Sequence, residues 1–188
     1  MNYEITAIEE QKKDPNRCSV FINGAFGFGL SKKAVERYQL CVGMVLDQPA
    51  YEKLMAALQL DKAKFKALDM ISRGSKSEKQ MREKLIQAEY SEYIVEEVMQ
   101  FLKKYQYIDD DALAKRYIES RSQYSHKSLR QIKAELYRKG ILVDQVKDYC
   151  EDTEEREEAN IEYFLDKFRY DPTWDIKQKQ KIINRLLT

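Results

Sequence analysis

An internal repeat in the second half of the chain restricts the fold more than any other sequence feature. When the chain is shifted by 51 positions, serine and apolar residues fall on residues that can play the same part. The matched pairs are Ser77 with Ser128, Met81 with Ile132, Leu85 with Leu136, Tyr90 with Ile141, Val95 with Val146, and Val98 with Tyr149. Self-similarity at a fixed period is typical of stacked units that share one continuous core.

Each repeated unit is expected to be helical, because apolar residues after Leu60 recur at helical spacing. One apolar stripe is expected to comprise Met81, Leu85 and Ile86, and the next Ile94, Val98, Phe101, Leu102 and Tyr105. Ser77 and Ser91 are the expected N-caps. The acidic run 109–111 is expected to begin the leading helix of the second unit, since carboxylates suit the positive end of a helix dipole. The pattern predicts tandem three-helix repeats.

The N-terminal segment has a different pattern, typical of strands. Apolar and polar residues alternate from Tyr3, and Asn23-Gly24 separates two apolar runs as in a type I′ hairpin. A turn is expected at Asp14-Pro15-Asn16. A short helix capped by Ser31 is expected through Tyr38, and a second helix from about Pro49 to Leu58. This segment is therefore predicted to be a small β-rich extension of a mainly α-helical chain.

A third unit is predicted because a further shift of 50 positions places Ile132 on Ile182 and Leu136 on Leu186. It should begin near Glu154, and its last helix would fall beyond Thr188, so we expect it to be incomplete. The predicted divisions are an N-terminal hairpin-containing extension with short helices over 1–60, repeat 1 over 61–108, repeat 2 over 109–152 and repeat 3 over 153–188.

Three segments of the repeat region resemble the RecX family, over about residues 60–150. The string ALDMISRGSKSEKQMREKL is similar to the family's first repeat, in which a helix ending in Ser-Arg precedes a capped Ser-Glu helix. YIDDDALAKRYIESR looks like the turn and leading helix of the second repeat, and LRQIKAELYRKGI like its next helix. The strand-rich N-terminus is similar to an extension in some bacterial members.

The resemblance implies an elongated, curved, right-handed array of three-helix units. It also implies a regulator of the RecA recombinase that lies in the groove of the RecA–DNA filament. Such a protein would modulate, mostly by inhibition, the recombinase, ATPase and coprotease activities in DNA recombination, DNA repair and the SOS response. The expected partners are therefore the RecA filament and, mainly in its presence, DNA.

Charge is strongly segregated although the net charge is only +1. Residues 121–139 hold six basic residues against one acidic residue, and residues 73–84 hold five against two. Residues 144–166 hold ten acidic residues against two basic ones. The expected filament or DNA contacts are the basic residues of the first two segments: Arg73, Lys76, Lys79, Arg82, Lys84, Arg121, Lys127, Arg130, Lys133, Arg138 and Lys139.

A repeating basic surface suits a periodic polyanion, because it favours counterion release and electrostatic steering. The alternative is an ordinary solvated helix face balanced by nearby glutamates. Tyr124 and Tyr137 could stack on bases, although aromatic residues on helices more often lie in a core or an interface. The acidic stretch could be a docking face for a basic partner, but it is more typical of a soluble, glutamate-rich helix that precedes Tyr163. Its negative charge should repel DNA.

Motifs for catalysis or cofactor binding are not expected in this chain. The glycine pattern near Gly27 does not match a phosphate-binding loop, and His126 is the sole histidine. Cys18, Cys41 and Cys150 are widely spaced and read as free thiols of a reducing compartment. No apolar run approaches the ~20 residues of a membrane span. We therefore expect a cytoplasmic, non-enzymatic protein that uses no metal, cofactor, membrane or small-molecule substrate.

Two other functions remain open at this point. The chain could be a stand-alone nucleic-acid-binding helical repeat protein, whose affinity for naked DNA would fall steeply with salt. It could also be a scaffold that binds a peptide. The resemblance favours the regulator of the RecA filament over both.

Overall fold

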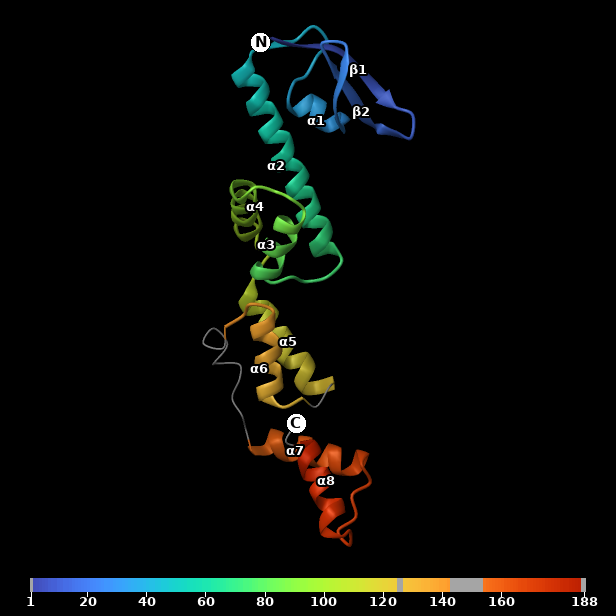
Figure 1. The fold of residues 1–188 in the computed structure, drawn as a ribbon, viewed down its shortest axis with the longest axis vertical. Helices are drawn as coiled ribbons and strands as arrows, with labels where there is room; N and C mark the ends of the chain where they lie inside the picture. The colour runs from blue at the N-terminus through green and yellow to red at the C-terminus, as the bar shows by residue number, and fades with distance from the viewer. Residues whose placement is uncertain (1, 125–126, 143–153, 187–188) are drawn as a thin grey trace. The chain divides into compact units, whose positions relative to one another are not determined.

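The computed structural model describes residues 2–124, 127–142 and 154–186 (Figure 1). The chain divides into two compact units, Met1–Lys62 and Ala63–Thr188. The first unit holds a small sheet, and the second holds the repeated helices. The fold is thus mainly α-helical with a small N-terminal antiparallel sheet, as predicted.

The sheet is antiparallel and has the strand order β3-β2-β1-β4. Its strands are β1 (Tyr3–Gln11), β2 (Asp14–Ile22), β3 (Ala25–Ser31) and β4 (Val45–Leu46). The predicted type I′ turn is confirmed, because Asn23 and Gly24 have φ values of 50° and 82°. The predicted turn at Asp14-Pro15-Asn16 is wrong. These residues begin β2, and the chain reverses one step earlier, where Gln11 pairs with Asp14.

One short helix and the first part of a long helix complete the first unit. The predicted helix after Ser31 is confirmed as α1 (Lys32–Arg37), whose first turn donates from Ala34 N to the Ser31 hydroxyl. The helix expected to end at Leu58 instead runs as α2 (Gln48–Ser72). No glycine or proline interrupts the sequence between Pro49 and Ser72, so nothing stops the helix where the apolar pattern changes. The core residues of this unit are Ile5, Val20, Ile22, Phe28, Leu30, Leu40, Leu54 and Leu58.

The first repeat continues with α3 (Glu78–Gln87) and α4 (Glu92–Lys104). Their predicted caps, Ser77 and Ser91, are confirmed. The predicted stripes are only partly correct, since Ile86 and Tyr105 are exposed. Ile86 is one residue beyond the buried Leu85 and therefore points about 100° away from it around the helix. On α4 the buried face is wider than predicted, and its buried residues are Ile94, Val95, Val98, Met99 and Leu102.

The second repeat contains α5 (Asp110–Tyr124) and α6 (Leu129–Arg138). Asp109 caps α5 by accepting a hydrogen bond from Ala112 N at 2.9 Å. The buried residues of this repeat are Ala114, Ile118, Leu129, Ile132, Leu136 and Ile141. The predicted repeat partners Val146 and Tyr149 lie outside the described residues. The equivalent Met81, Leu85, Ile132 and Leu136 are all fully buried, as equal places in a repeat require.

Further helices follow as α7 (Glu154–Lys167) and α8 (Ile176–Leu186). α7 begins at the residue where the third repeat was expected to start. Asp175 and Gln178 cap α8 reciprocally, because the backbone amide of each donates to the side-chain oxygen of the other. Ile182, the expected counterpart of Ile132, is buried.

Five helix ends in the described ranges share one termination motif. In each, a residue with positive φ follows the helix, and the next amide donates back to a carbonyl five residues earlier. The positive-φ residues are Gln39, Glu89, Gln106, Gly140 and Arg169. Glu89 and Gly140 are 51 positions apart, so the turn after the capped helix is itself repeated.

Candidate nucleoprotein-binding surface

The basic segment of the second repeat forms a regular helix with two distinct faces. Ser128 starts α6 by accepting from Gln131 N at 3.3 Å. Leu129, Ile132 and Leu136 then follow at spacings of three and four, and all are buried. Burial of this stripe orients α6, so the residues on its other side must face solvent.

The outer face of α6 carries Arg130, Lys133, Tyr137 and Arg138, which recur at spacings of three, four and one. Arg130 and Arg138 are exposed and Lys133 is half-buried. Within the described part of the chain, none of these three cations pairs with a carboxylate; Arg138 donates from Nε to the Ala134 carbonyl at 3.4 Å. Tyr137, for which both base stacking and a core or interface position were considered, is exposed on the same face.

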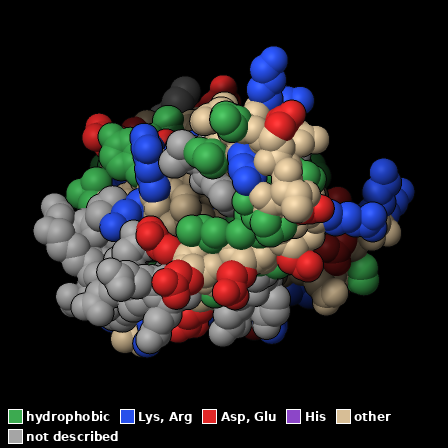
Figure 2. Space-filling model, turned by 90° about the horizontal axis from the view of Figure 1, so that it is seen from below, with side chains coloured by type: hydrophobic (Ala, Val, Ile, Leu, Met, Phe, Trp, Pro, Cys, Tyr) green, Lys and Arg blue, Asp and Glu red, His purple; other side chains and the backbone are tan. Residues whose placement is uncertain are grey.

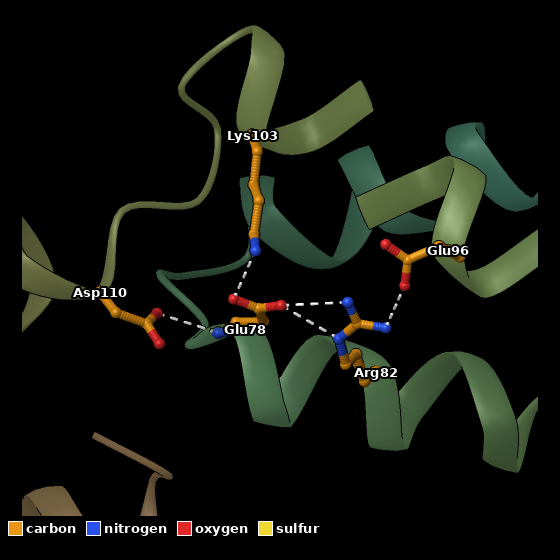
Figure 3. Close-up of polar contacts among 5 residues, drawn as sticks. All are labelled: Glu78, Arg82, Glu96, Lys103 and Asp110. Atoms are coloured by element: carbon orange, nitrogen blue, oxygen red, sulfur yellow. Dashed lines mark hydrogen bonds and ion pairs between the residues drawn. The ribbon is translucent and has the colours of Figure 1, made fainter. Parts of the chain in front are cut away.

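The equivalent helix of the first repeat bears similar cations, but they are paired. Lys79 and Arg82 correspond to Arg130 and Lys133 in the 51-residue register. Arg82 donates to Glu96 at 2.8 Å and to Glu78 at 3.1 Å (Figure 3). Lys79 lies 3.9 Å from Glu83.

This difference follows from the sequence of the two helices. Leu129 and Ala134 of α6 stand where α3 has Glu78 and Glu83. Arg130 and Lys133 therefore lack the acidic neighbour one turn away that their counterparts have. The repeated basic surface is thus unequal, because Arg130 and Lys133 on α6 are unpaired where Lys79 and Arg82 on α3 are paired.

Glu78 is the centre of a polar network at the start of α3 (Figure 3). Its carboxylate lies 2.8 Å from Lys103 Nζ, and its backbone amide donates to Asp110 Oδ1 at 2.9 Å. The hydrogen bond from Lys103 holds the pKa of Glu78 below its usual value, whereas burial raises the pKa of Asp110. α3, α4 and α5 meet at this network. Sequence periodicity gave no sign of it, because its members are far apart in the chain.

The remaining predicted contacts differ in how available they are. Arg73 pairs with Asp69 at 2.7 Å, and Lys76 donates to the Gly74 carbonyl at 3.1 Å. Lys84 is exposed and makes no ion pair with any described carboxylate. The structure therefore leaves Lys84 of this group accessible.

Glu135 holds two more of the predicted cations. It forms ion pairs with Lys127 and, at 3.7 Å, with Arg121, and it accepts from the Tyr117 hydroxyl at 2.7 Å. Hydrogen bonds from Lys127 and Tyr117 lower the pKa of Glu135. Lys139 Nζ lies over the Tyr117 ring, 5.2 Å from its centroid. The side chain of Tyr124 and the whole of His126 lie outside the described residues.

The described part of the acidic stretch is an ordinary solvated helix. Glu157, Glu158, Glu162 and Asp166 of α7 are exposed. The rings of Phe164 and Phe168 stack 5.9 Å apart. Figure 2 shows acidic and hydrophobic side chains side by side on the face it presents. Positions 144–153 of this stretch lie outside the described residues.

Metal-ligand clusters and membrane-spanning helices are both absent from the described residues. Among them, no three His, Cys, Asp or Glu residues are grouped closely enough to hold a metal ion. No helix within the described ranges combines the length and apolarity needed to cross a membrane.

Family models match three parts of the chain. The regulatory protein RecX N-terminal domain matches residues 3–47. The first and second RecX three-helix domains match residues 63–102 and 109–147. The last of these matches contains α5 and α6.

Individual proteins are similar over almost the whole chain. The regulatory protein RecX of Clostridium acetobutylicum is 33% identical, over 97% of this chain and 88% of the relative. That of Clostridioides difficile is 29% identical, over 97% of this chain and 85% of the relative. A crystal structure of regulatory protein RecX superposes with a TM-score of 0.70 at 25% identity, covering 98% of this chain and 92% of the other.

Proposed function

The chain belongs to the RecX family, and we propose from this premise that it binds the RecA–DNA filament and regulates it. The regulation is mainly inhibition of the recombinase, ATPase and coprotease activities. It acts by binding and needs no catalysis, cofactor or small-molecule substrate. Its place is the cytoplasm, in DNA recombination, DNA repair and the SOS response.

The observation that carries this proposal is the outer face of α6. Arg130, Lys133 and Arg138 present three positive charges that no described carboxylate neutralises. Unpaired cations on a rigid helix attract phosphates or acidic protein surfaces, because no internal ion pair has to be broken first. Lys84 adds a similar charge on α3.

The proposed mechanism is that a protein built of repeated helical units binds along a filament built of repeated subunits. A regulator that contacts adjacent filament subunits stabilises one arrangement of them, and so hinders the conformational cycle that ATP hydrolysis requires. It also occupies the groove that partner DNA or a coprotease substrate would enter. The acidic residues of α7 would direct nucleic acid away from that helix.

The experiment is a titration of RecA ATPase activity on single-stranded DNA with increasing amounts of this protein. The proposal predicts progressive inhibition that saturates near the concentration of filament sites. A binding assay with the same DNA, with and without RecA, separates the two main functions. The proposal predicts tighter association with the filament than with naked DNA. Equal or tighter binding to naked DNA, with steep loss in salt, would favour the stand-alone nucleic-acid-binding protein.

A further inference from the structure

Three aromatic rings form a cluster at the end of α4, apart from the basic face of α6. The Phe101 centroid lies 5.1 Å from that of Tyr105 and 6.1 Å from that of Tyr107. The two tyrosine centroids are 6.3 Å apart. Each ring therefore contacts the other two, as aromatic pairs at 4.5–7 Å do.

The cluster exists because the chain turns sharply after α4. Gln106 has a φ of 55°, and Tyr107 N donates to the Leu102 carbonyl at 2.8 Å. This turn brings the rings on either side of Gln106 back toward Phe101. A contact between Tyr107 and the last helical turn commonly accompanies this motif, so it could have a purely structural purpose.

Comparison with the other helix ends argues for more than a structural role. At the four other turns of this type in the described chain, the residue in the place of Tyr107 is buried or half-buried: Leu40, Tyr90, Ile141 and Tyr170. Tyr107 is 48% exposed, and Tyr105, which the turn does not need, is 57% exposed. Two large rings thus remain exposed at this turn, whereas the residue in the place of Tyr107 is covered at the four other turns.

Positive charge accompanies the rings. Lys64 Nζ lies 5.0 Å from the Phe101 centroid, and Lys104 Nζ lies 5.8 Å from the Tyr105 centroid. Neither lysine has an ion pair with a carboxylate in the described part of the chain. These lysines place cations beside the exposed rings.

A cavity of about 630 Å³ borders the cluster, because Tyr107 is among its lining residues. Three of the lining residues are basic, namely Lys76, Lys115 and Arg116, and two are acidic, Asp109 and Glu119. Asp109 caps α5, while Lys76 and Arg116 donate to the backbone carbonyls of Gly74 and Ala112. Basic side chains therefore outnumber acidic ones by one in the lining, and the volume lies within the range of ligand sites.

We propose that Phe101, Tyr105, Tyr107 and the adjoining cavity bind single-stranded nucleic acid. Unpaired bases stack on the exposed tyrosine rings, and phosphates contact Lys64, Lys104 and the basic residues of the cavity. This pairing of aromatic surfaces with cations is the usual means of holding single strands without sequence preference. A duplex fits less well, since its base faces are already stacked. An apolar protein partner would not need the surrounding lysines.

The test is fluorescence anisotropy of a labelled oligothymidine at low salt, without RecA. The double variant Tyr105→Ala/Tyr107→Ala should weaken binding by about tenfold or more, since loss of one stacked base is worth roughly that much. The double variant Tyr105→Phe/Tyr107→Phe should bind like the unmodified protein, because phenylalanine retains the stacking ring.

Two further variants keep the test decisive. Tyr105→Ala alone leaves the Tyr107 contact intact, so it should fold and still lose affinity. Tyr93→Ala is the matched control, because Tyr93 is 70% exposed on the same helix but outside the cluster; it should leave the Kd unchanged. An unchanged Kd in both alanine variants of the cluster would overturn the proposal and favour a protein-docking surface.

An abasic oligonucleotide separates the rings from the charges. It should bind the unmodified protein and the alanine variants equally, because it offers phosphates but no bases. If the alanine variants bind the abasic strand more weakly than the unmodified protein does, stacking is not the cause and the proposal fails. Since RecA is absent, these results are independent of whether the protein binds the filament.

Discussion

The Ser77 hydroxyl donates a hydrogen bond to the carbonyl oxygen of Lys139, which joins the first turn of α3 to the last turn of α6. The same hydroxyl accepts from Gln80 N at 3.2 Å. Ser77 is fully buried, so one side chain both caps a helix of repeat 1 and binds it to repeat 2. Both ends of this contact lie close to basic residues proposed to meet the filament.

Replacing Ser77 should therefore cost more stability than replacing its repeat partner Ser128. Ser77→Ala removes a cap and leaves a partly buried carbonyl without its donor, for a total of about 2–3 kcal/mol. Ser128→Ala removes a cap whose residue is exposed, which should cost about 1 kcal/mol. Chemical denaturation followed by helical circular dichroism measures both. Equal losses would mean that the bond to Lys139 contributes nothing.

Gly140 lies against Lys79, and a Cβ added there would come within 2.5 Å of the Lys79 Cβ. Its φ of +86° adds a backbone penalty for any other residue. Gly43 has the same φ but no atom within 4 Å, so it isolates that penalty. Gly43→Ala should cost about 1 kcal/mol and Gly140→Ala about 3 kcal/mol. Amide hydrogen exchange around each site measures the loss, and equal values would contradict close contact between the repeats.

The carboxylate of Glu78 should make the free energy of unfolding depend on pH. Its pKa is lower in the folded protein than the usual 4.5, because Lys103 and Arg82 bind the charged form. Such a group stabilises the fold above the unfolded value, and that contribution is lost as pH falls through the folded pKa. Glu78→Gln should thus cost about 1 kcal/mol at neutral pH, and less as pH falls below 4.5.

The matched control for this effect is Glu83→Gln. Glu83 lies on the same helix and is exposed, and its pairing with Lys79 is at 3.9 Å. Denaturation at a series of pH values should show almost no difference between Glu83→Gln and the unmodified protein. A Glu78→Gln difference that stays constant from neutral to acid pH would refute the assigned ion pairs.

Asp110 has the opposite linkage. Burial raises its pKa in the folded protein, so the charged form opposes folding and stability falls as pH rises through that window. Asp110→Asn keeps an oxygen that can accept from Glu78 N, and it removes the buried charge. It should be as stable as the unmodified protein or more so at neutral pH. Asp110→Ala loses the acceptor and should be less stable by about 1–2 kcal/mol. Thermal denaturation of the two variants checks their order.

Local patterns in the sequence were sufficient for features set by neighbouring residues. Asn23-Gly24 required positive φ at both positions, and Ser31, Ser77 and Ser91 preceded helices that each needed an acceptor. The same reasoning failed at Asp14-Pro15-Asn16, where turn-forming residues instead begin β2. A strand partner, here Gln11 opposite Asp14, outweighed the local preference.

The candidate site was less predictable, because ion pairing depends on tertiary position. The number of basic residues in each segment predicted the same role for Arg82 and Lys133. The structure distinguishes them, because Glu96 from another helix binds Arg82. Lys127 was also expected to be free to contact the filament or DNA, but it forms an ion pair with Glu135, two helical turns later. The exposed rings of Tyr105 and Tyr107 were unexpected, since helical spacing alone assigned Tyr105 to the core.

Charge reversal on α6 tests the proposed filament contact most directly. Arg130→Glu/Lys133→Glu changes two cations that make no described ion pair, and Lys12→Glu/Lys13→Glu makes the same change in net charge in the exposed turn before β2. The measurement is the concentration of each protein that half-inhibits RecA ATPase on single-stranded DNA. We predict that it rises about tenfold or more for the α6 variant, as expected when two charge-assisted contacts are lost, and stays unchanged for the control. Unchanged inhibition by the α6 variant would contradict the assignment of this face to the filament.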